Sequence, residues 1–340
     1  MNLNNPLYNL LFFIVLAVLF YLSFRPVKGW FWLLKNNLKV NEKIVIEDIL
    51  KQLYTYENSG KRVTINNLTR TLKFNDNLII ETLKKMSLSE LIALDGDVVK
   101  LTTKGREYAL KIVRVHRLWE KYLAEKTGYD KTEWHNRAEM MEHKLDHNET
   151  NLLAKQLGNP MYDPHGDPIP TQLGIIAEVK GVPLSTLAVN TIGKISHIED
   201  EPDVIYKQIL AENIHIGSYI RVVENNNERI VFYAEGEEFK LAPIVAANIT
   251  VEVFEKDVVL EEDAVRLSSL RKGETAVILG ISKESRGESR RRLLDLGFVK
   301  GASIKIDLVS PLQNPKAYLV KGTSIALRDD QASKILIKKD

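Results

Sequence analysis

Two histidines and three glutamates gather in the stretch EWHNRAEMMEH, residues 133–143, although the whole chain of 340 residues has only seven histidines. If residues 132–147 are helical, His135, Glu139, Glu142 and His143 share one arc of roughly 100°, because each residue turns the helix by about 100°. The apolar side chains of Trp134, Ala138, Met141 and Leu145 fall on a separate arc. Imidazole nitrogen and carboxylate oxygen are ligands for divalent metal ions, so this face predicts a metal site.

A second pair, His116 and Glu120, lies one helical turn apart in the upstream segment VHRLWEKYL. Metal sites are commonly built between helices whose ligand-bearing faces meet. The alternative is a solvated surface on which the acids pair with neighbouring lysines and arginines. In the metal hypothesis the ligands divide into two sets, one for each ion: His116, Glu120 and His135, and Glu139, Glu142 and His143.

The chain has no cysteine. This excludes disulfides, thiolate metal sites and cysteine nucleophiles, and leaves only nitrogen and oxygen as metal ligands. Such ligands favour Mn²⁺ or Fe²⁺, and Zn²⁺ or Co²⁺ would also bind in vitro.

The overall charge gives no general attraction to nucleic acid, because 47 basic and 45 acidic residues leave a net charge of +2. Any DNA contact therefore needs a local basic patch. With 44% hydrophobic and 27% charged residues, the composition is that of a globular protein of two or three domains.

The N-terminus differs from the rest of the chain. Residues 7–24, LYNLLFFIVLAVLFYLSF, carry no charge and predict one transmembrane helix. A signal peptide is the alternative, but no basic residue precedes the apolar run and no small-residue cleavage site follows it. Basic residues follow the run, so we expect residues 1–40 to anchor a single-pass protein in the cytoplasmic membrane, with the bulk of the chain in the cytoplasm.

Residues 41–110 predict a winged helix-turn-helix domain, because three helical segments precede two β-prone runs around Asp95-Gly96-Asp97. The candidate recognition helix begins at residue 75. Asparagines can pair with adenine and lysines can hold phosphates, whereas acidic residues in the same segment oppose DNA binding. The candidate DNA-binding residues are Asn75, Asn77, Thr82, Lys84 and Lys85. The alternative is a winged fold that no longer binds a DNA sequence.

Residues 111–160 predict helices for metal binding and dimerisation, and residues 161–183 a stiff, proline-rich connector. Short β-prone runs follow. A weak internal repeat aligns residues 210–222 with 294–306, about 84 positions apart, and predicts two small β-barrels at 184–253 and 266–338. The expected fold class is α+β.

Three motifs resemble the diphtheria-toxin-repressor (DtxR) and manganese-repressor family of metal-dependent transcription regulators. They are RVHRLWEKYL at 114–123, WHNRAEMMEHKL at 134–145 and GNPMYDPHGDPIP at 158–170. The resemblance implies that the chain forms a homodimer and that the first β-module is an SH3-like domain. It further implies two metal sites: an ancillary site with ligands His116, Glu120 and His135, and a primary site with ligands Glu139, Glu142 and His143.

The family takes a further primary-site ligand from the first helix of the winged domain, and that position matches Asp48. A second glutamate, which manganese sensors carry on this helix, is replaced here by Lys51. An ammonium cannot coordinate a cation, which argues against a binuclear manganese site of that kind. Some members add a carboxylate from the SH3-like domain, and Glu201 or Asp203 lies near that place.

The C-terminal segment resembles a FeoA domain, a small SH3-like module associated with ferrous iron transport. The match is carried by SRRRLLDLGFVKGASI at 289–304. The segment RPVKGWFWLLK, which follows the apolar run, is similar to the end of metal-permease chains that carry a fused regulator.

We therefore predict a membrane-tethered, iron- or manganese-dependent DNA-binding regulator of metal homeostasis. The alternative is a metal-sensing accessory subunit of a ferrous-iron or manganese transporter that does not bind DNA. An enzyme is not expected, because the sequence has no nucleophile elbow, phosphate loop or HExxH motif.

Overall fold

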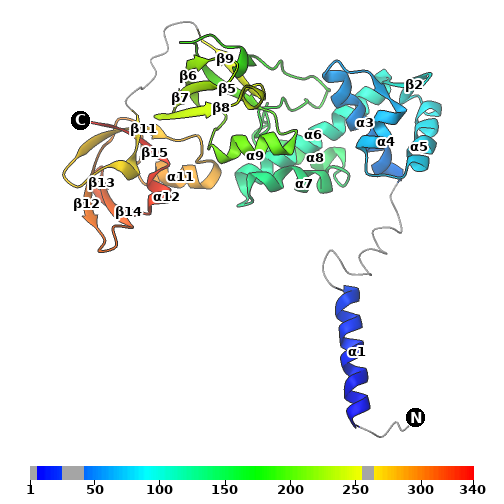
Figure 1. The fold of residues 1–340 in the computed structure, drawn as a ribbon, viewed down its shortest axis with the longest axis horizontal. Coiled ribbons are helices and arrows are strands. Elements are labelled where there is room, and N and C mark those ends of the chain that lie inside the picture. The colour runs from blue at the N-terminus through cyan, green and yellow to red at the C-terminus, as the bar shows by residue number, and fades with distance from the viewer. Residues whose placement is uncertain (1–5, 25–41, 255–263) are drawn as a thin grey trace. The chain divides into compact units, whose positions relative to one another are not determined.

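The computed structural model describes residues 6–24, 42–254 and 264–340 (Figure 1). The chain divides into two compact units, Met1–Ile112 and Val113–Asp340. The boundary falls within helix α6, Thr103–Lys126.

Helix α1, Pro6–Phe24, covers the apolar run that was predicted to cross a membrane. That prediction is wrong, and with it the single-pass location in the cytoplasmic membrane: among the described residues, no helix combines the length and apolar character that a bilayer-spanning segment needs. The basic flank at 25–40 lies outside the described residues.

In the first unit, three helices precede a hairpin, in the predicted order. The elements are α3 Glu42–Asn58, β1 Val63–Thr64, α4 Ile65–Thr71, α5 Asp76–Leu88, β2 Ile92–Asp95 and β3 Val98–Leu101. Asn75 begins α5, because its side chain accepts a hydrogen bond from the Asn77 amide. The strands form one sheet in the order β1-β3-β2, and Ile49, Leu68 and Leu83 are buried in the core.

Two shorter helices follow α6, namely α7, Lys131–Glu142, and α8, His147–Gln156. The supposed single helix over 132–147 therefore ends sooner than expected, and His143 is the C-cap residue of α7. The reason is local, because the Asp146 side chain accepts from the Glu149 amide and the Glu149 side chain from that of Asp146. This capping box starts a new helix at His147.

The proline-rich segment 161–183 is irregular up to the short strand at its end, as a connector should be, but its first half is not a simple spacer. Asp163 and His165 are buried. Gly166 has a φ of +92°, and a Cβ there would lie 2.2 Å from the Ser196 carbonyl oxygen, so only glycine fits this close approach. The loop is therefore packed against the start of the β-rich region.

Two six-stranded sheets follow, and their strand orders are equivalent: β4-β9-β5-β6-β7-β8 and β10-β15-β11-β12-β13-β14. The predicted repeat is therefore present, and Figure 1 shows the two sheets as two separate groups of strands. The first module contains β4 Val182–Pro183, η1 Leu184–Thr186, β5 Ile192–Ile198, α9 Asp203–Ala211, β6 Tyr219–Asn225, β7 Ile230–Ala234, β8 Glu237–Leu241, α10 Pro243–Ala246 and β9 Ile249–Val253.

The second module repeats this plan. It contains β10 Val265–Arg266, η2 Leu267–Ser269, β11 Thr275–Ile281, α11 Gly287–Asp295, β12 Ser303–Val309, β13 Lys316–Val320, β14 Thr323–Leu327, α12 Asp329–Ala332 and β15 Ile335–Lys339. Register shifts occur at equivalent places, between Ile195 and His197 in β5 and between Ile278 and Gly280 in β11. Each module encloses its own hydrophobic core.

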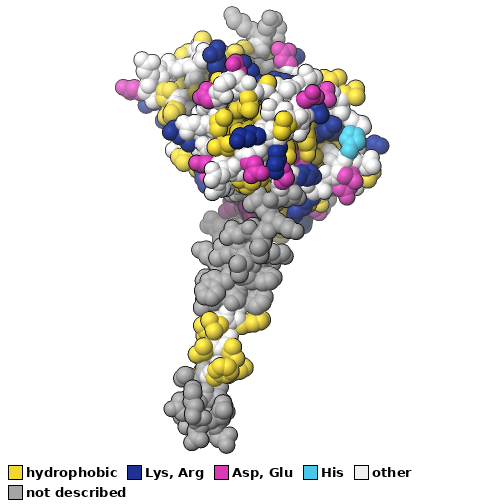
Figure 2. All heavy atoms as spheres, turned by 90° about the vertical axis from the view of Figure 1, so that its right-hand side faces the viewer, with side chains coloured by type: hydrophobic (Ala, Val, Ile, Leu, Met, Phe, Trp, Pro, Cys, Tyr) yellow, Lys and Arg dark blue, Asp and Glu magenta, His cyan; other side chains and the backbone are white. Residues whose placement is uncertain are grey.

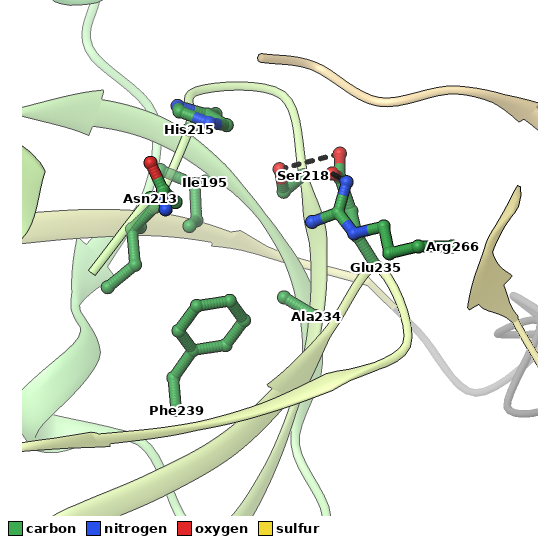
Figure 3. A pocket seen from close by; sticks show the side chains of 9 residues that line it. Ile195, Asn213, His215, Ser218, Ala234, Glu235, Phe239 and Arg266 are labelled. Atoms are coloured by element: carbon green, nitrogen blue, oxygen red, sulfur yellow. Dashed lines mark hydrogen bonds and ion pairs between the residues drawn. The ribbon is translucent and has the colours of Figure 1, made fainter. Parts of the chain in front are cut away.

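Glu235, in the turn after β7, joins the two modules. Its carboxylate accepts hydrogen bonds from the Ser282 hydroxyl at 2.6 Å and the Lys283 amide at 3.0 Å, both in the second module. It also accepts from Ser218 at 3.1 Å within its own module, and Arg266 lies beside it (Figure 3). One carboxylate thus links the β-modules.

Candidate metal centre

Helix α6 carries the first part of the site. His116 and Glu120 lie one turn apart and are 6% and 2% exposed. The His116 Nε2 and Glu120 Oε1 atoms are 3.0 Å apart. A carboxylate and an imidazole are buried together only at a free-energy cost unless they are paired or bind a metal, so their burial indicates a defined role.

Helix α7 supplies the second part. Its buried residues Trp134 and Ala138 hold the helix, and this fixes the neighbouring face that carries the ligands. The His135 Nδ1 atom lies 3.4 Å from Glu120 Oε1, and Nε2 lies 3.4 Å from Glu139 Oε1. His116, Glu120 and His135 therefore come together as predicted from the meeting of two helix faces, with one ligand atom from each within 4.8 Å of the others.

The buried loop after α8 adds a histidine that the sequence analysis did not include. The Asp163 carboxylate accepts hydrogen bonds from the backbone amides of His165 and Asp167, at 2.8 and 2.9 Å. Arg117 donates to the Asp167 carboxylate at 3.0 Å and thereby ties this turn to α6. His165 is held with its Nε2 atom 4.0 Å from Glu120 Oε1.

The first β-module adds a carboxylate. The Ile198 amide donates to the His165 carbonyl at 2.9 Å, so the end of β5 lies against the loop. Asp200 follows, with Oδ2 3.6 Å from His135 Nδ1, and forms a second potential ligand group with Glu120 and His165. Glu201 and Asp203, the carboxylates expected near this place, are both exposed, and Asp203 pairs with Lys207 at 2.6 Å.

In this cluster, the Glu120 carboxylate and the neighbouring imidazoles shift one another's pKa values. Burial by itself would raise the pKa of Glu120, but the charge and hydrogen bonds of His116, followed by His135, hold that pKa well below its usual range. Burial would lower the pKa of His135, but hydrogen bonds to Glu120 and Glu139 raise it to about 10. The negative charge of Glu120 and the positive charge of the protonated His135 therefore stabilise each other.

The donor set fits a divalent cation. His165 Nε2 is buried and has no hydrogen-bond partner, while His135 Nδ1 is buried between the carboxylates of Glu120 and Asp200. Buried polar atoms are almost always hydrogen-bonded, so the unpartnered His165 nitrogen beside Glu120 calls for a ligand. Nitrogen and oxygen donors without sulfur suit Mn²⁺ and Fe²⁺.

The second predicted set is only partly assembled within α7 and its end. Glu142 is buried and its Oε2 atom lies 2.5 Å from His116 Nδ1, while His143 Nε2 is 3.6 Å from Glu142 Oε1. Glu139 instead lies beside His135, and its side chain is 52% exposed. Asp48 and Lys51 are half-buried residues of α3 in the first unit, and a ligand role for Asp48 stays a prediction.

The predicted DNA-binding residues all lie at or in α5. Asn75, Asn77, Lys84 and Lys85 are exposed. Thr82 is 1% exposed because it faces the core of the first unit, so its hydroxyl does not reach the surface. Thr82 is therefore removed from the candidate DNA contacts.

Comparison with protein families agrees with this arrangement. The family model of the metal-binding and dimerisation domain of iron-dependent repressors matches residues 102–171, which include α6, α7 and the His165 loop. The FeoA domain model matches residues 265–339.

Individual proteins extend the likeness. The iron-dependent repressor IdeR of Mycobacterium leprae is 30% identical over 173 residues, which cover 47% of this chain and 75% of that repressor. A manganese-dependent transcriptional repressor in complex with manganese has a TM-score of 0.56 and 27% identity, over 61% of this chain and 99% of the repressor. A probable metal transport system membrane protein of Chlamydia trachomatis is 47% identical over 70 residues, but these cover only 21% of this chain and 16% of that protein.

The fold and the metal-binding domain define a class, the metal-dependent transcriptional regulators, which are not enzymes. Within that class, the chain belongs to the family of iron-dependent repressors, and it carries a FeoA domain at its C-terminal end. Its relatives bind Fe²⁺ or Mn²⁺.

Proposed function

We propose that this chain is a DNA-binding transcriptional regulator of metal homeostasis, which acts as a homodimer and is activated by Fe²⁺ or Mn²⁺. The observation that carries the proposal is the buried cluster of nitrogen and oxygen ligands around Glu120, which includes the His165 Nε2 atom without a hydrogen-bond partner. Such a cluster has little structural value by itself, because paired buried charges often stabilise a fold no better than apolar residues.

We assign the first ion to the groups that meet at Glu120. Its ligands come from α6, α7, the loop after α8 and the first β-module: His116, Glu120, His135, His165 and Asp200. A bound divalent cation supplies positive charge that attracts all of these groups at once. Because they lie far apart in the sequence, ion binding would stabilise their common arrangement.

The second ion is assigned to Glu139, Glu142 and His143, with Asp48 as the fourth ligand. Asp48 belongs to α3 and precedes α5 in the same compact unit, so a metal bond at Asp48 would restrict the winged domain. In a dimer, this restriction would set the spacing of two recognition helices on DNA. The assignment rests on the family resemblance.

The DNA contacts are assigned to the exposed face of α5. Asn75 and Asn77 lie at its N-terminal end, where a recognition helix contacts base edges, and Lys84 is exposed further along. Lys85 pairs with Glu42 at 2.9 Å and Glu81 at 3.4 Å, and these carboxylates weaken its attraction to DNA phosphates. On the face drawn in Figure 2, basic and acidic side chains are intermixed. We therefore expect weak non-specific binding, with affinity that depends on a specific site.

The test is capture of genomic DNA fragments by the full chain under anaerobic conditions, with Fe²⁺, Mn²⁺ or a chelator. Enrichment of one palindromic sequence with metal but not with chelator is the expected result. The double variant Glu142→Ala with His143→Ala should lose it, whereas His147→Ala, which changes an exposed histidine outside the cluster, should retain it. Retention of no sequence, with metal bound, would refute the DNA-binding function.

A second candidate function is favoured by the FeoA match at residues 265–339. In that case the chain senses metal for a ferrous-iron or manganese transporter and does not bind DNA. It predicts a complex with the transporter that Leu296→Asp weakens, while Leu312→Asp, a more exposed leucine of the same module, does not. An unchanged complex in both variants would argue against a role for this surface.

A further inference from the structure

A cavity of about 620 Å³ lies within the second unit, away from the cluster at Glu120. Its walls come from four parts of that unit: the turn between α6 and α7 with the adjoining helix ends, the end of α9 with its following loop, the loop that leads into α11, and Lys334 before β15. Volumes of this size are typical of small-molecule sites. The lining residues that matter here are Tyr129, Lys131, Leu210, His215, Ser285 and Arg286.

Two cations line this cavity without an ionic partner. Lys131 Nζ contacts His215 Nδ1 at 3.0 Å, and Arg286 Nη1 donates to the Pro164 carbonyl at 3.4 Å. Neither forms an ion pair with any residue in the described ranges. Unpaired cations in a partly buried wall are costly, so the cavity favours a ligand of negative charge.

The other charged lining groups are already engaged. Asp130 caps α7, accepting from the Thr132 amide at 2.9 Å, and Glu284 lies 3.8 Å from Lys334. Lys207, which also lines the cavity, pairs with Asp203, which does not. The net effect of Lys131 and Arg286 is therefore not cancelled locally.

The proximity of these groups affects their titration. Burial, then the charge of Arg286, lowers the pKa of Lys131 to about 8. Burial, followed by the charges of Lys131 and Arg286, lowers the pKa of His215 to about 3, so this imidazole is neutral at physiological pH. The nearby carboxylates of Glu284 and Asp130 raise the pKa of Lys131, but burial and Arg286 outweigh them.

Two buried polar atoms in this wall lack hydrogen-bond partners. They are the Ser285 hydroxyl and His215 Nε2, from residues that are 3% and 4% exposed. Figure 3 shows His215 from the side of the first module, where it also lines a much smaller cavity beside Asn213. Ser285 lines only the larger of the two cavities, so its unused hydroxyl is a binding group for a ligand there.

The N-terminus of α11 opens at the same wall. The helix begins at Gly287, no side chain caps it, and Ser285, Arg286 and Ser289 all line the cavity. Gly287 has a φ of +52°, and a Cβ there would lie 2.6 Å from the Glu125 carbonyl oxygen. This close contact holds the start of α11 against the end of α6. An uncapped helix N-terminus attracts anions through its amides and its dipole.

We propose that this cavity binds a small organic phosphate, with the phosphate group at the N-terminus of α11 between Arg286, Lys131 and the Ser285 hydroxyl. Arginine and a helix N-terminus together are the donors that phosphate oxygens accept best. The organic part would pack against Tyr129 and Leu210, which line the same cavity. This second ligand is independent of the metal and of the proposed DNA-binding function.

The test is calorimetric titration of the full chain, at about pH 7.5 where a phosphate monoester is a dianion, with phenyl phosphate as the probe. Inorganic phosphate and phenol serve as the charged and the uncharged halves of that probe. We expect phenyl phosphate to bind, inorganic phosphate to bind more weakly, and phenol not to bind. Phenol binding as tightly as phenyl phosphate would contradict the proposal, and so would equal affinities of the two phosphates.

Variants locate the site. Arg286→Gln should raise the Kd for phenyl phosphate at least about tenfold, because a charge-assisted hydrogen bond is lost. Ser285→Ala, which leaves the charge and the fold intact, should raise it roughly threefold. Arg291→Gln is the matched control, since it makes the same change on the exposed face of the same helix and should leave the Kd unchanged.

Two outcomes would overturn the proposal. One is no measurable heat with either phosphate up to about 10 mM. The other is an equal loss of affinity in Arg286→Gln and Arg291→Gln, which would indicate attraction to surface charge only. Mn²⁺ titration of the same samples separates these results from a failure of the metal site and shows whether the variants are folded.

Discussion

The two β-modules present the same loop with opposite charge. After β5, the loop at 199–202 reads Glu-Asp-Glu-Pro, and Asp200 approaches His135 in the metal cluster. After β11, the loop at 282–286 reads Ser-Lys-Glu-Ser-Arg, and Arg286 lines the cavity next to Lys131. Both loops lead into a helix, α9 or α11, at equivalent places in sheets of equivalent strand order.

This difference separates what the fold determines from what the side chains determine. The repeated sheet delivers a loop to the helical part of the second unit twice, at two places along α7: to His135 within the helix, and to Lys131 at its start. The acidic loop completes a group of ligands suited to a cation. The basic loop, with the helix N-terminus behind it, forms a wall suited to an anion.

The largest expected effect comes from exchanging the charges of the two loops. Asp200→Lys places an ammonium where the second module has Lys283, close to His135 and Glu120. An ammonium cannot coordinate a cation and repels it, so the Kd of the ion bound at Glu120 should rise at least roughly hundredfold. Anaerobic competition titration with Mn²⁺ measures this.

Glu201→Lys is the matched control for that exchange. It makes the same charge reversal at the adjacent residue, which is exposed and lies outside the group around Glu120. We expect its Mn²⁺ affinity to remain within about twofold to threefold of the unchanged chain. Equal losses in both variants would mean that only the general charge of the loop matters.

The second effect concerns the histidine that the loop after β5 holds in place. His165→Gln removes an imidazole whose Nε2 atom has no other partner, and should weaken the same ion by roughly tenfold to a hundredfold. His147→Gln makes the same change at an exposed histidine and should have no effect. An unchanged titration curve for His165→Gln would exclude this residue as a ligand.

The part of the site that could be predicted is the part that lies within single helices. The 3.6-residue period placed His135 and Glu139 on one face of α7, and a spacing of four placed His116 over Glu120. The internal repeat was visible because both modules have a similar turn before an equivalent strand, β6 in the first module and β12 in the second. These are local patterns, which a sequence shows directly.

His165 and Asp200 could not be predicted in the same way. His165 reaches Glu120 only because Asp163 and Arg117 fold the loop back on α6. Asp200 was missed by one residue, and along an extended chain a shift of one residue turns a side chain to the opposite side. The apolar run at 7–24 misled for another reason, since its lack of charge, its length and the basic residues after it were taken together as evidence for a membrane span.

A smaller effect is expected at the link between the modules. Glu235→Gln would replace a carboxylate that accepts hydrogen bonds from Ser218, Ser282 and the Lys283 amide. Loss of these charge-assisted bonds should lower the stability of the docked second module by about 1–2 kcal/mol. Hydrogen exchange of the Lys283 amide measures this. Glu238→Gln, at an exposed position of β8, is the control, and equal exchange rates in both variants would refute the role of Glu235.

The smallest expected effect is a pH dependence that belongs only to the basic loop. The pKa of Lys131 lies near 8 in the folded chain, below the ordinary lysine value of 10.5, so this ammonium loses its proton as the pH rises through about 8. Phenyl phosphate is already a dianion there, and Arg286 keeps its charge. The Kd should therefore rise roughly threefold to tenfold between about pH 7 and pH 9.

The sign of the stability effect is fixed by the same shift. Between about pH 8 and pH 10.5 the unfolded chain binds more protons at Lys131 than the folded chain does, so the ligand-free protein should gain stability over this range. Lys131→Met should remove both dependences. The groups that face Lys131 are His215, which is already neutral there, and the charged side chains of Asp130, Glu284 and Arg286. If Lys131→Met kept the same rise in Kd, the lysine would not contact the phosphate, and the anion would be held by the α11 loop alone.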